Sequence, residues 1–269
     1  MIERQEESPV DLDFEAFKRK VHASYGIDLN AYKRQQMERR LRANMQKHGV
    51  STFLQYFAAL NSNKAALEEF RDRITINVSE LFRNPDQFEI LKSKVLRQLL
   101  SARPDLLVWS AGCSCGAEAY TLAILLDELA PNGRHKIIAT DIDEKMLARC
   151  SAGVYQENEM RCVSRQRTLK YFDKRPEGYA AKDFLRERIA CRRHDLLQDR
   201  FDRDFDLIVC RNVVIYFTDD AKARLYRRFL QALRPGGYLF VGGTERISDY
   251  DNIGFENDMQ YFYRRPCSS

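Results

Sequence analysis

Two turns in the middle of the chain have the residues needed to bind a nucleoside. The apolar segment 106–110 ends in a turn that contains Gly112, and a glycine there lets a ligand lie against the backbone. Asp141 ends a second apolar segment, where a carboxylate can accept hydrogen bonds from both ribose hydroxyls. Asp141 could instead cap the helix expected from Glu144, but Asp143 is better placed for that. We therefore expect a cofactor that contains a nucleoside.

The spacing of the glycines argues against a dinucleotide. Gly112 and Gly116 do not form the G-x-G-x-x-G pattern that holds a pyrophosphate at a helix N-terminus. S-adenosylmethionine has no pyrophosphate and needs no third glycine. The turn alone is a weak signal, because a plain tight turn can have the same composition. Together with Asp141, it favours S-adenosylmethionine over a nicotinamide cofactor.

A mostly parallel sheet is needed to bring these turns together. Apolar segments alternate with helical ones from residue 106 onward, which is typical of βαβ units. We expect strands at 106–110, 136–140, 205–210 and 238–242, an edge strand at 260–264, and helices at 117–129, 144–150 and 219–233. Thr218 should cap the last helix and residues 234–237, Arg-Pro-Gly-Gly, should stop it. The charged, irregular region 155–193 predicts an inserted subdomain with a final strand near 189–193.

The N-terminal part predicts a bundle of four short helices. Apolar residues recur there at helical spacing: Phe14, Phe17 and Val21; Met37, Leu41 and Met45; Phe53, Leu54, Phe57 and Leu60; Leu67, Phe70 and Ile74. Ser51 and Asn63 are plausible N-caps.

Composition restricts the class of protein. The chain has 269 residues, enough for one large domain and a small one, and its net charge of +5 does not by itself imply nucleic acid. No apolar stretch is long enough to cross a bilayer, and the polar N-terminus lacks the apolar core of a secretory signal. The seven scattered cysteines lack zinc-site spacing. We expect a cytoplasmic protein with reduced thiols and no metal.

Five blocks of the sequence resemble the signature blocks of the CheR chemoreceptor methyltransferases. They are 77–83 (NVSELFR), 109–120, 139–143, 210–217 (CRNVVIYF) and 242–245 (GGTE), in the family's order. The resemblance covers nearly the whole chain. It implies an α/β fold, the class I S-adenosylmethionine-dependent methyltransferase fold, which is Rossmann-like with a mostly parallel seven-stranded sheet. A small all-helical N-terminal domain and an inserted small antiparallel subdomain accompany that sheet in the family.

The resemblance also implies domain limits. Residues 1–72 would form the helical, receptor-facing domain and 73–88 a linker that contributes to the active site. Residues 89–269 would form the methyltransferase domain, with the subdomain at about 155–190. Some relatives use that subdomain to bind a tethering peptide at the receptor C-terminus, and the sequence leaves this use open.

The implied activity is methylation of receptor glutamates. The chain would transfer the methyl group of S-adenosyl-L-methionine to glutamate side chains, giving methyl esters and S-adenosyl-L-homocysteine, for adaptation in chemotaxis-type signalling. Its partners would be the cytoplasmic helices of methyl-accepting chemoreceptors, with no nucleic acid, no membrane insertion and a monomeric state. The basic stretch 33–47 would then meet acidic receptor helices, although a solvated helix face is the ordinary alternative.

The matching positions imply a set of site residues. Those for the cofactor are Asn77, Ser79 and Arg83 of the linker block, Gly112 of the turn, Glu118 for the methionine end, Asp141 for the ribose, Asp195 and Leu196 beside the adenine, and Arg211 and Asn212 at a strand end. Arg83 and Tyr216 are the catalytic candidates, and we expect them to hold the substrate carboxylate.

The chain departs from the family pattern at a few of these places. Cys115, Ala117 and Ala119 stand where the family commonly has Thr, Glu and Pro, while Glu118 is kept. Asp195 stands where relatives often have asparagine, and Ser79 keeps the hydroxyl of the threonine found in some relatives. These changes bear on cofactor affinity and leave the expected fold unaltered.

Two other functions compete with this one. A methyltransferase acting on nucleic-acid bases typically has an Asn/Asp-Pro-Pro-Tyr/Phe turn, and residues 212–216 (NVVIY) contain no proline. A non-catalytic signalling protein could bind S-adenosylmethionine or S-adenosylhomocysteine without transferring a methyl group. The presence of Arg83, Glu118, Asp141 and Tyr216 together argues against that alternative.

Overall fold

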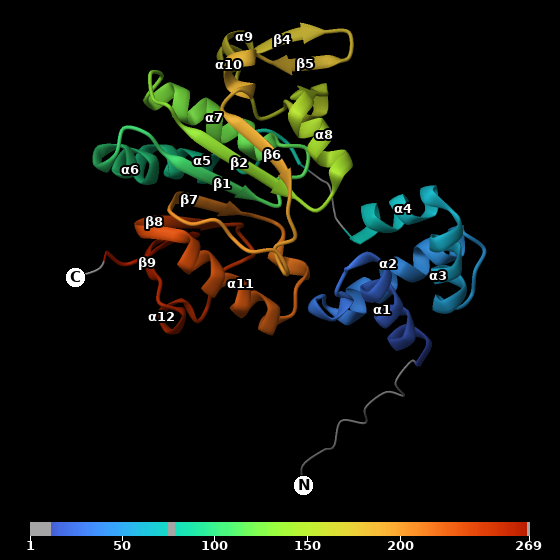
Figure 1. The fold of residues 1–269 in the computed structure, drawn as a ribbon. Coiled ribbons are helices and arrows are strands. Elements are labelled where there is room, and N and C mark those ends of the chain that lie inside the picture. The colour runs from blue at the N-terminus through green and yellow to red at the C-terminus, as the bar shows by residue number, and fades with distance from the viewer. Residues whose placement is uncertain (1–11, 75–78, 268–269) are drawn as a thin grey trace. The chain divides into compact units, whose positions relative to one another are not determined.

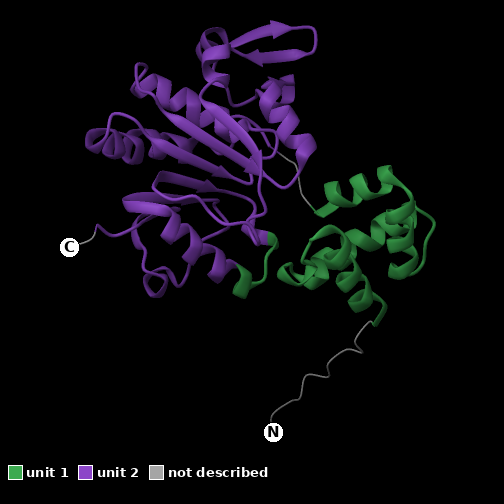
Figure 2. Cartoon of the chain, in the orientation of Figure 1, with its two compact units in different colours: residues 1–76, 216–221 green, residues 77–215, 222–269 purple. Residues whose placement is uncertain are grey.

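The chain folds into two compact units. The computed structural model describes residues 12–74 and 79–267. Unit 1 comprises residues 1–76 together with 216–221, and unit 2 comprises 77–215 and 222–269 (Figure 2).

Four helices around an aromatic core form most of unit 1. They are α1 (Leu12–Tyr25), α2 (Arg34–Lys47), α3 (Phe53–Ser62) and α4 (Lys64–Ile74), with a short 3₁₀ turn η1 (Leu29–Ala31) between the first two (Figure 1). The ring of Phe17 contacts those of Phe53, Tyr56 and Phe70, and all four side chains are buried. The predicted helical bundle is confirmed, because most of the apolar residues at helical spacing meet in this core. Leu54 does not, since its side chain is exposed.

The predicted N-caps are half right. The side chain of Asn63 accepts hydrogen bonds from the backbone of the first turn of α4, as predicted. Ser51 is the wrong cap for α3. Thr52 takes that role, because its hydroxyl accepts from the backbone N–H of Gln55 at 3.2 Å and the Gln55 side chain accepts from the backbone of Thr52, which completes a capping box.

A second, distant segment completes unit 1. The backbone N–H of Lys33 donates to the carbonyl oxygen of Tyr216 at 2.9 Å, and the N–H of Thr218 donates to the carbonyl of Ala31 at 2.8 Å. Tyr32 and Phe217 form an antiparallel β-bridge between these bonds, with their rings edge to face at 5.2 Å. Residues 216–221 therefore belong to the helical unit, although they lie between a strand and a helix of unit 2 in sequence.

Unit 2 is built on a seven-stranded sheet in the order β6-β2-β1-β7-β8-β10-β9. Its strands are β1 (Leu107–Ala111), β2 (Lys136–Asp141), β6 (Ile189–Arg193), β7 (Phe205–Cys210), β8 (Leu233–Val241), β9 (Glu256–Met259) and β10 (Phe262–Arg264). The first five in spatial order are parallel, and β10 pairs antiparallel with both neighbours. The predicted mostly parallel seven-stranded sheet is confirmed.

The C-terminal part of this sheet corrects two predictions. The helix predicted at 219–233 ends at Ala232, just before residues 234–237, as predicted. These residues lie inside β8, however, and do not form a separate turn, because the pairing with β7 jumps from Leu233 to Tyr238 and this irregularity accommodates the proline. The strand predicted at 260–264 forms as β10, but β9 pairs with its other side, so β9 and not β10 is the edge.

Helices cover both faces of the sheet. The segment before β1 forms α5 (Pro85–Ile90), a π-helical turn η2 (Leu91–Leu96) and α6 (Arg97–Ala102). The later helices are α7 (Ala117–Leu129), α8 (Glu144–Ala152), α11 (Asp219–Ala232) and α12 (Tyr250–Ile253). Thr218 accepts from the first turn of α11, as predicted for its cap.

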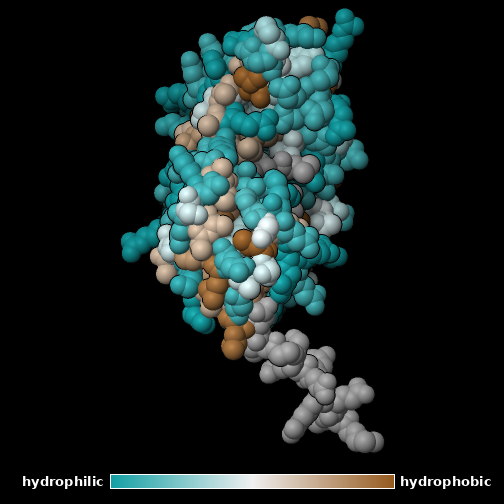
Figure 3. All heavy atoms as spheres, turned by 90° about the vertical axis from the view of Figure 1, so that its right-hand side faces the viewer, coloured by the Kyte–Doolittle hydropathy of each residue, from teal (hydrophilic) through white to brown (hydrophobic). Residues whose placement is uncertain are grey.

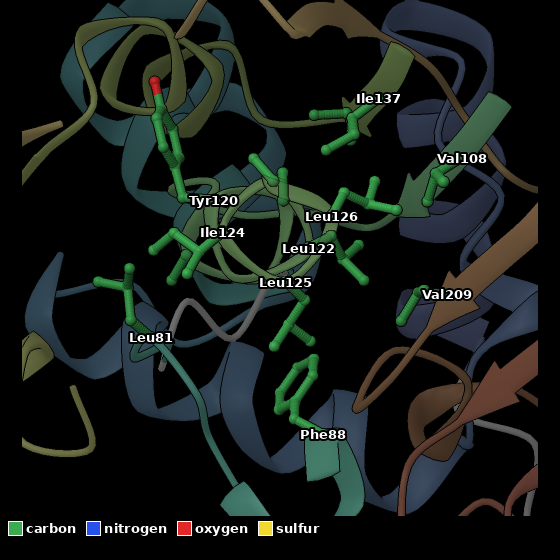
Figure 4. Close-up of a cluster of buried hydrophobic side chains, with 14 of the residues drawn as sticks. Leu81, Phe88, Val108, Tyr120, Leu122, Ile124, Leu125, Leu126, Ile137 and Val209 are labelled. Atoms are coloured by element: carbon green, nitrogen blue, oxygen red, sulfur yellow. The ribbon is translucent and has the colours of Figure 1, made fainter. Parts of the chain in front are cut away.

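Neighbouring residues of β1 point their side chains to opposite faces of the sheet. Val108 faces the cluster of apolar side chains around α7, where Leu122 and Leu126 approach Val108, Ile137 and Val209 (Figure 4). Trp109 points the other way and contacts Phe229 of α11 at 5.5 Å. This alternation follows from the period of two in a strand, and it buries the sheet on both sides.

The charged region after α8 forms the predicted antiparallel subdomain. Its three strands are β3 (Val154–Tyr155), β4 (Phe172–Arg175) and β5 (Gly178–Ala181), in the order β3-β5-β4. The turn η3 (Glu157–Glu159) and the helices α9 (Arg165–Tyr171) and α10 (Asp183–Arg186) connect them to the main sheet. Strands of two to four residues are too short to produce a clear alternating pattern in the sequence.

The surface is mostly polar on the face drawn in Figure 3, where hydrophobic residues appear as small scattered groups. None of the helices formed by residues 12–74 and 79–267 has both the length and the apolar character that a membrane span requires.

Candidate active site

The parallel strands bring most of the predicted site residues to one edge of the sheet. The ends of β1 and β2 pair at Ala111 and Thr140, Asp141 pairs with Arg193 of β6, and the last residues of β7 and β8 also pair. In an open α/β sheet, ligands bind at the carboxyl ends of the strands. The residues that follow these ends are therefore the natural lining of a binding site.

The turn after β1 accepts only glycine at Gly112. Its φ of +80° is in the left-handed region, and a Cβ there would lie 2.5 Å from Cγ2 of Val213. The backbone N–H groups of Gly112 and Cys113 both donate to the carbonyl of Thr140 at 2.8 Å. The turn is thus fixed against both β2 and the loop after β7, so its backbone has one conformation available to a ligand.

Asp141 ends β2 with a buried carboxylate. It accepts hydrogen bonds from the backbone N–H of Ser114 at 2.8 Å and of Asp143 at 3.0 Å. Burial raises the pKa of Asp141, and these hydrogen bonds oppose the rise. Asp143 caps α8, as predicted, by accepting from the N–H groups of Lys145 and Met146. Each carboxylate oxygen of Asp141 keeps acceptor capacity beyond these bonds, which ribose hydroxyls can use.

Glu118, in the first turn of α7, is a buried carboxylate with one weak ionic partner. It accepts from the hydroxyl of Ser110 at 2.8 Å, and its Oε2 lies 3.7 Å from Nη1 of Arg211. Burial raises the pKa of Glu118 and lowers that of Arg211, and their mutual attraction opposes both shifts. For both Glu118 and Arg211, the effect of burial on the pKa exceeds the effect of their attraction. Arg211 therefore does not fully compensate the charge of the Glu118 carboxylate. A second cation would be stabilised beside Glu118.

Arg211 connects the end of β7 to the segment that carries Arg83. Its Nη2 donates to the carbonyl of Arg83 at 3.1 Å, to Oδ1 of Asn84 at 3.0 Å and to Oε1 of Gln87 at 2.8 Å. The guanidinium also lies 4.9 Å from the rings of Phe88 and Phe240. Arg211 therefore makes a structural link, and it reaches the predicted cofactor site through Glu118.

The segment around Arg83 has an unusual backbone. Phe82 and Asn84 flank Arg83 with φ values of +56° and +60°, a region that few non-glycine residues adopt. The N–H of Phe82 donates to the hydroxyl of Thr121 at 3.0 Å, and the ring of Phe82 is buried. These contacts fix the backbone before Arg83, and the hydrogen bond from Arg211 to the side chain of Asn84 holds the residue after it. Its positive charge is near enough to lower the pKa of Arg211 further.

Of the other two linker candidates, the structure describes Ser79 but not Asn77. Ser79 is half-buried, and its side chain is hydrogen-bonded to the thiol of Cys115 in the turn after β1, whose pKa is raised mainly by burial. Asn77 lies outside the described residues. The structure thus places Ser79, but not Asn77, beside the predicted cofactor turn.

Asp195 and Leu196 follow β6 next to Asp141. The N–H of His194 donates to the carbonyl of Asp141 at 2.9 Å. The carboxylate of Asp195 accepts from the N–H of Leu197 at 2.8 Å, so it caps its own turn, and the carbonyl of Leu196 accepts from Arg228 at 2.6 Å. The side-chain oxygen of an asparagine at position 195 could accept the same bond.

Glu245 is a site residue that sequence reasoning did not select. Its buried carboxylate accepts from the backbone N–H groups of Asn212 at 2.5 Å and Gly242 at 2.9 Å. Burial raises its pKa, and N–H groups of this loop, including those of Val213 and Ile215, oppose the rise. Glu245 therefore ties the loops after β7 and β8 together and supports Asn212, whose φ is +62°. The block at 242–245 was the available signal.

Tyr216 belongs to a different unit from the other described candidates. It ends the 3₁₀ turn η4 (Val214–Tyr216) and belongs to unit 1, whereas Arg83, Glu118, Asp141, Asp195 and Arg211 belong to unit 2. The basic stretch also lies in unit 1, on α2. Glu38 pairs there with Arg42 at 2.7 Å, while Arg39 is exposed.

Comparisons with known proteins agree with this arrangement. Residues 77–261 match the family described as CheR methyltransferase, SAM binding domain, and residues 12–75 match CheR methyltransferase, all-alpha domain. A chemotaxis protein methyltransferase of Listeria innocua is 39% identical over 94% of this chain and 97% of the relative. Chemotaxis protein methyltransferase 1 of Pseudomonas aeruginosa is 34% identical over 90% and 93%. The chemotaxis protein methyltransferase of Salmonella typhimurium is 32% identical over 89% and 85%.

Proposed function

We propose that this chain, which belongs to the CheR methyltransferase family, methylates glutamate side chains of chemoreceptors. Its cofactor is S-adenosylmethionine, and unit 2 has the class I fold of methyltransferases that use it. The proposal rests mainly on Glu118. Its carboxylate charge is only partly compensated by Arg211, and it lies at the same sheet edge as Asp141. A non-catalytic binding protein is not favoured, because the chain's relatives are named methyltransferases over nearly their full length.

The residues present fit this cofactor. Glu118 would bind the ammonium of the methionine part, which adds a cation to its 3.7 Å contact with Arg211. Asp141 would accept from the ribose hydroxyls, and Asp195 with Leu196 would lie beside the adenine. The turn at Gly112 would pass close to the ligand, as its left-handed backbone without a side chain allows.

The reaction requires little acid–base catalysis from the protein. When bound, S-adenosylmethionine supplies a methyl group that is already activated by its sulfonium. A glutamate carboxylate, with an ordinary pKa of about 4.3, is ionised at neutral pH and needs no general base. The chain must therefore align the carboxylate and keep water away. Such alignment can contribute about 7–11 kcal/mol to lowering a barrier.

Arg83 and Tyr216 are the residues that we assign to the substrate carboxylate. A guanidinium offers paired donors that match a carboxylate, and a phenol offers one more. The backbone of Arg83 is fixed by its left-handed neighbours and by the hydrogen bond from Arg211 to its carbonyl. Arg211 is thus a positioning residue in this proposal, and one oxygen of the carboxylate remains free to attack.

The test of the function is transfer of a labelled methyl group. The purified chain is incubated with methyl-labelled S-adenosylmethionine and receptor-bearing membranes from its own organism. Label on protein that is released by mild base identifies carboxyl methyl esters, and peptide mapping identifies the glutamates. Binding of the cofactor with no such label would favour the non-catalytic alternative and overturn the proposal.

Arg83→Ala tests the assignment of the carboxylate partner. We expect kcat/KM to fall about 10²-fold or more, because a charge-assisted pair of hydrogen bonds is lost. The Kd for S-adenosylhomocysteine, measured by calorimetry, should change far less. Arg83→Lys is the matched control, since it keeps the charge and loses only the paired geometry, and it should retain part of the rate. An unimpaired Arg83→Ala would refute the assignment.

A further inference from the structure

A cation from the helical unit lies on the ring of Tyr216. The guanidinium carbon of Arg40, on α2, is 4.5 Å from the centroid of that ring, within the range of a cation–π interaction. Both side chains are half-buried, while the neighbouring Arg39 is exposed. Arg34 and Arg42 of the basic stretch also lie over aromatic rings, those of Phe14 and Phe53, whereas the ring under Arg40 belongs to a catalytic candidate.

The surroundings of Arg40 hold its stem in place. Met37 and Leu41 are buried in the core of unit 1, on either side of Arg40 along α2. One turn later, the amide of Asn44 donates to the hydroxyl of Tyr56 at 2.6 Å in the same core. The helix is thus fixed in rotation, and Arg40 leaves it in a constant direction.

The backbone of Tyr216 is fixed from the same unit. Its carbonyl accepts from the N–H of Lys33 at 2.9 Å, and Phe217 pairs with Tyr32 just beyond it. Backbone pairing alone does not set the side-chain torsions of Tyr216. The contact with Arg40 acts on the ring itself and restricts that rotation.

We propose that Arg40 is a positioning residue for methyl transfer, and that its guanidinium holds the ring of Tyr216 in the orientation that binds the substrate carboxylate. This inference rests on the proposed role of Tyr216. It makes α2 more than a charged surface, because one of its arginines sets the geometry of a catalytic side chain. Arg40 acts through Tyr216 and affects turnover, whereas charges that only attract the receptor affect encounter.

Two other roles of Arg40 make different predictions. If Arg40 only adds to the positive charge of α2, its loss raises KM in a salt-dependent way and leaves kcat alone. If Arg40 only stabilises unit 1, its loss lowers the unfolding temperature and leaves the kinetics of the folded protein unchanged. Positioning lowers kcat in protein that is fully folded.

The experiment compares Arg40→Ala, Arg40→Lys and Arg39→Ala in the full chain, with receptor-bearing membranes as substrate. We expect Arg40→Ala to lower kcat about two- to thirtyfold, the range of one cation–π contact, at low and high salt. Arg40→Lys should recover part of kcat. Arg39→Ala removes the same charge from the same helix, and it should raise KM. The Kd for S-adenosylhomocysteine and the unfolding midpoint establish that each variant is folded.

A double-mutant cycle with Tyr216→Phe provides the decisive readout. If Arg40 acts through the phenol, Arg40→Ala should lower kcat much less in the Tyr216→Phe background than in the wild type. Equal effects in both backgrounds, or an unchanged kcat in Arg40→Ala, would overturn the inference and leave the proposed function intact. Absence of base-labile label with the wild type would overturn both.

Discussion

Replacing Glu118 by glutamine tests the electrostatic core of the proposed site. The change removes one charge and keeps the shape, and the amide oxygen can still accept from the hydroxyl of Ser110. We expect a charge-assisted hydrogen bond to the cofactor ammonium to be lost, at about 1.5–3 kcal/mol. The Kd for S-adenosylhomocysteine should therefore rise about 10- to 150-fold.

Stability should respond differently from affinity. Because the pKa of Glu118 is raised by burial, its ionised form is disfavoured in the folded state, and a neutral amide removes that penalty. A raised pKa contributes stability that is present below the ordinary glutamate pKa and is lost as the pH rises through the folded pKa. Glu118→Gln should thus gain stability relative to the wild type as the pH rises. Loss of the 3.7 Å contact to Arg211 opposes this gain, and Arg211 keeps its three oxygen acceptors.

The assay is calorimetric titration with two ligands at several pH values. S-adenosylhomocysteine has the amino-acid part, and adenosine lacks it. Glu118→Gln should weaken only the first, whereas Asp141→Asn should weaken both. In the wild type, affinity for S-adenosylhomocysteine should decline on acidification at pH values above the ordinary glutamate pKa of about 4.3, because protonation removes the carboxylate. Equal losses for adenosine and S-adenosylhomocysteine in Glu118→Gln would refute this account of the site.

Two further changes test the loops and the docking surface. Glu245→Ala should cost about 2–6 kcal/mol of unfolding free energy, measured by urea denaturation, because it leaves the buried N–H groups of Asn212 and Gly242 without their acceptor. If the basic stretch on α2 meets acidic receptor helices, Arg39→Glu with Arg42→Glu should raise KM for receptor membranes severalfold at low salt and less at high salt.

Each of these changes has a comparison that isolates its cause. Glu245→Gln keeps one acceptor oxygen, so it should be clearly more stable than Glu245→Ala; equal stability would show that the hydrogen bonds contribute little. Arg200→Glu with Arg203→Glu reverses two exposed charges in unit 2 and should leave KM for receptor unchanged. If both pairs raise KM equally, the effect is one of net charge and not of α2.

The sheet and its site edge could be predicted because each depends on local patterns. Residues 205–210 (FDLIVC) are apolar except for Asp206, and every one of them is buried, so the sequence shows the strand directly. Asp141 follows from its place at the end of β2, whereas Glu118, in the first turn of α7, was expected only from the family resemblance. Parallel pairing then brings such positions together without any further information.

Other features could not be predicted because they depend on contacts between distant parts of the chain. β9 reads Glu-Asn-Asp-Met, with no apolar alternation, and exists because β10 pairs with it across a tight turn at Tyr261. The carboxylate of Glu245, in the loop after β8, accepts hydrogen bonds from N–H groups of the loop after β7. Nothing in the local sequence of either loop indicates these bonds. The three oxygen atoms that accept from Arg211 belong to residues around the start of α5. That segment lies over a hundred residues before Arg211 in the sequence.

The pairing of residues 31–33 with 216–218 also has a consequence for synthesis on the ribosome. The four helices of unit 1 emerge first, but the segment that completes the unit is made only after most of unit 2. At about 5–20 residues per second, that delay is on the order of ten seconds. During this interval the nascent helical bundle exposes the strand-like edge at Tyr32 that later pairs with Phe217. Translation speed along unit 2 therefore sets how long that edge remains uncovered.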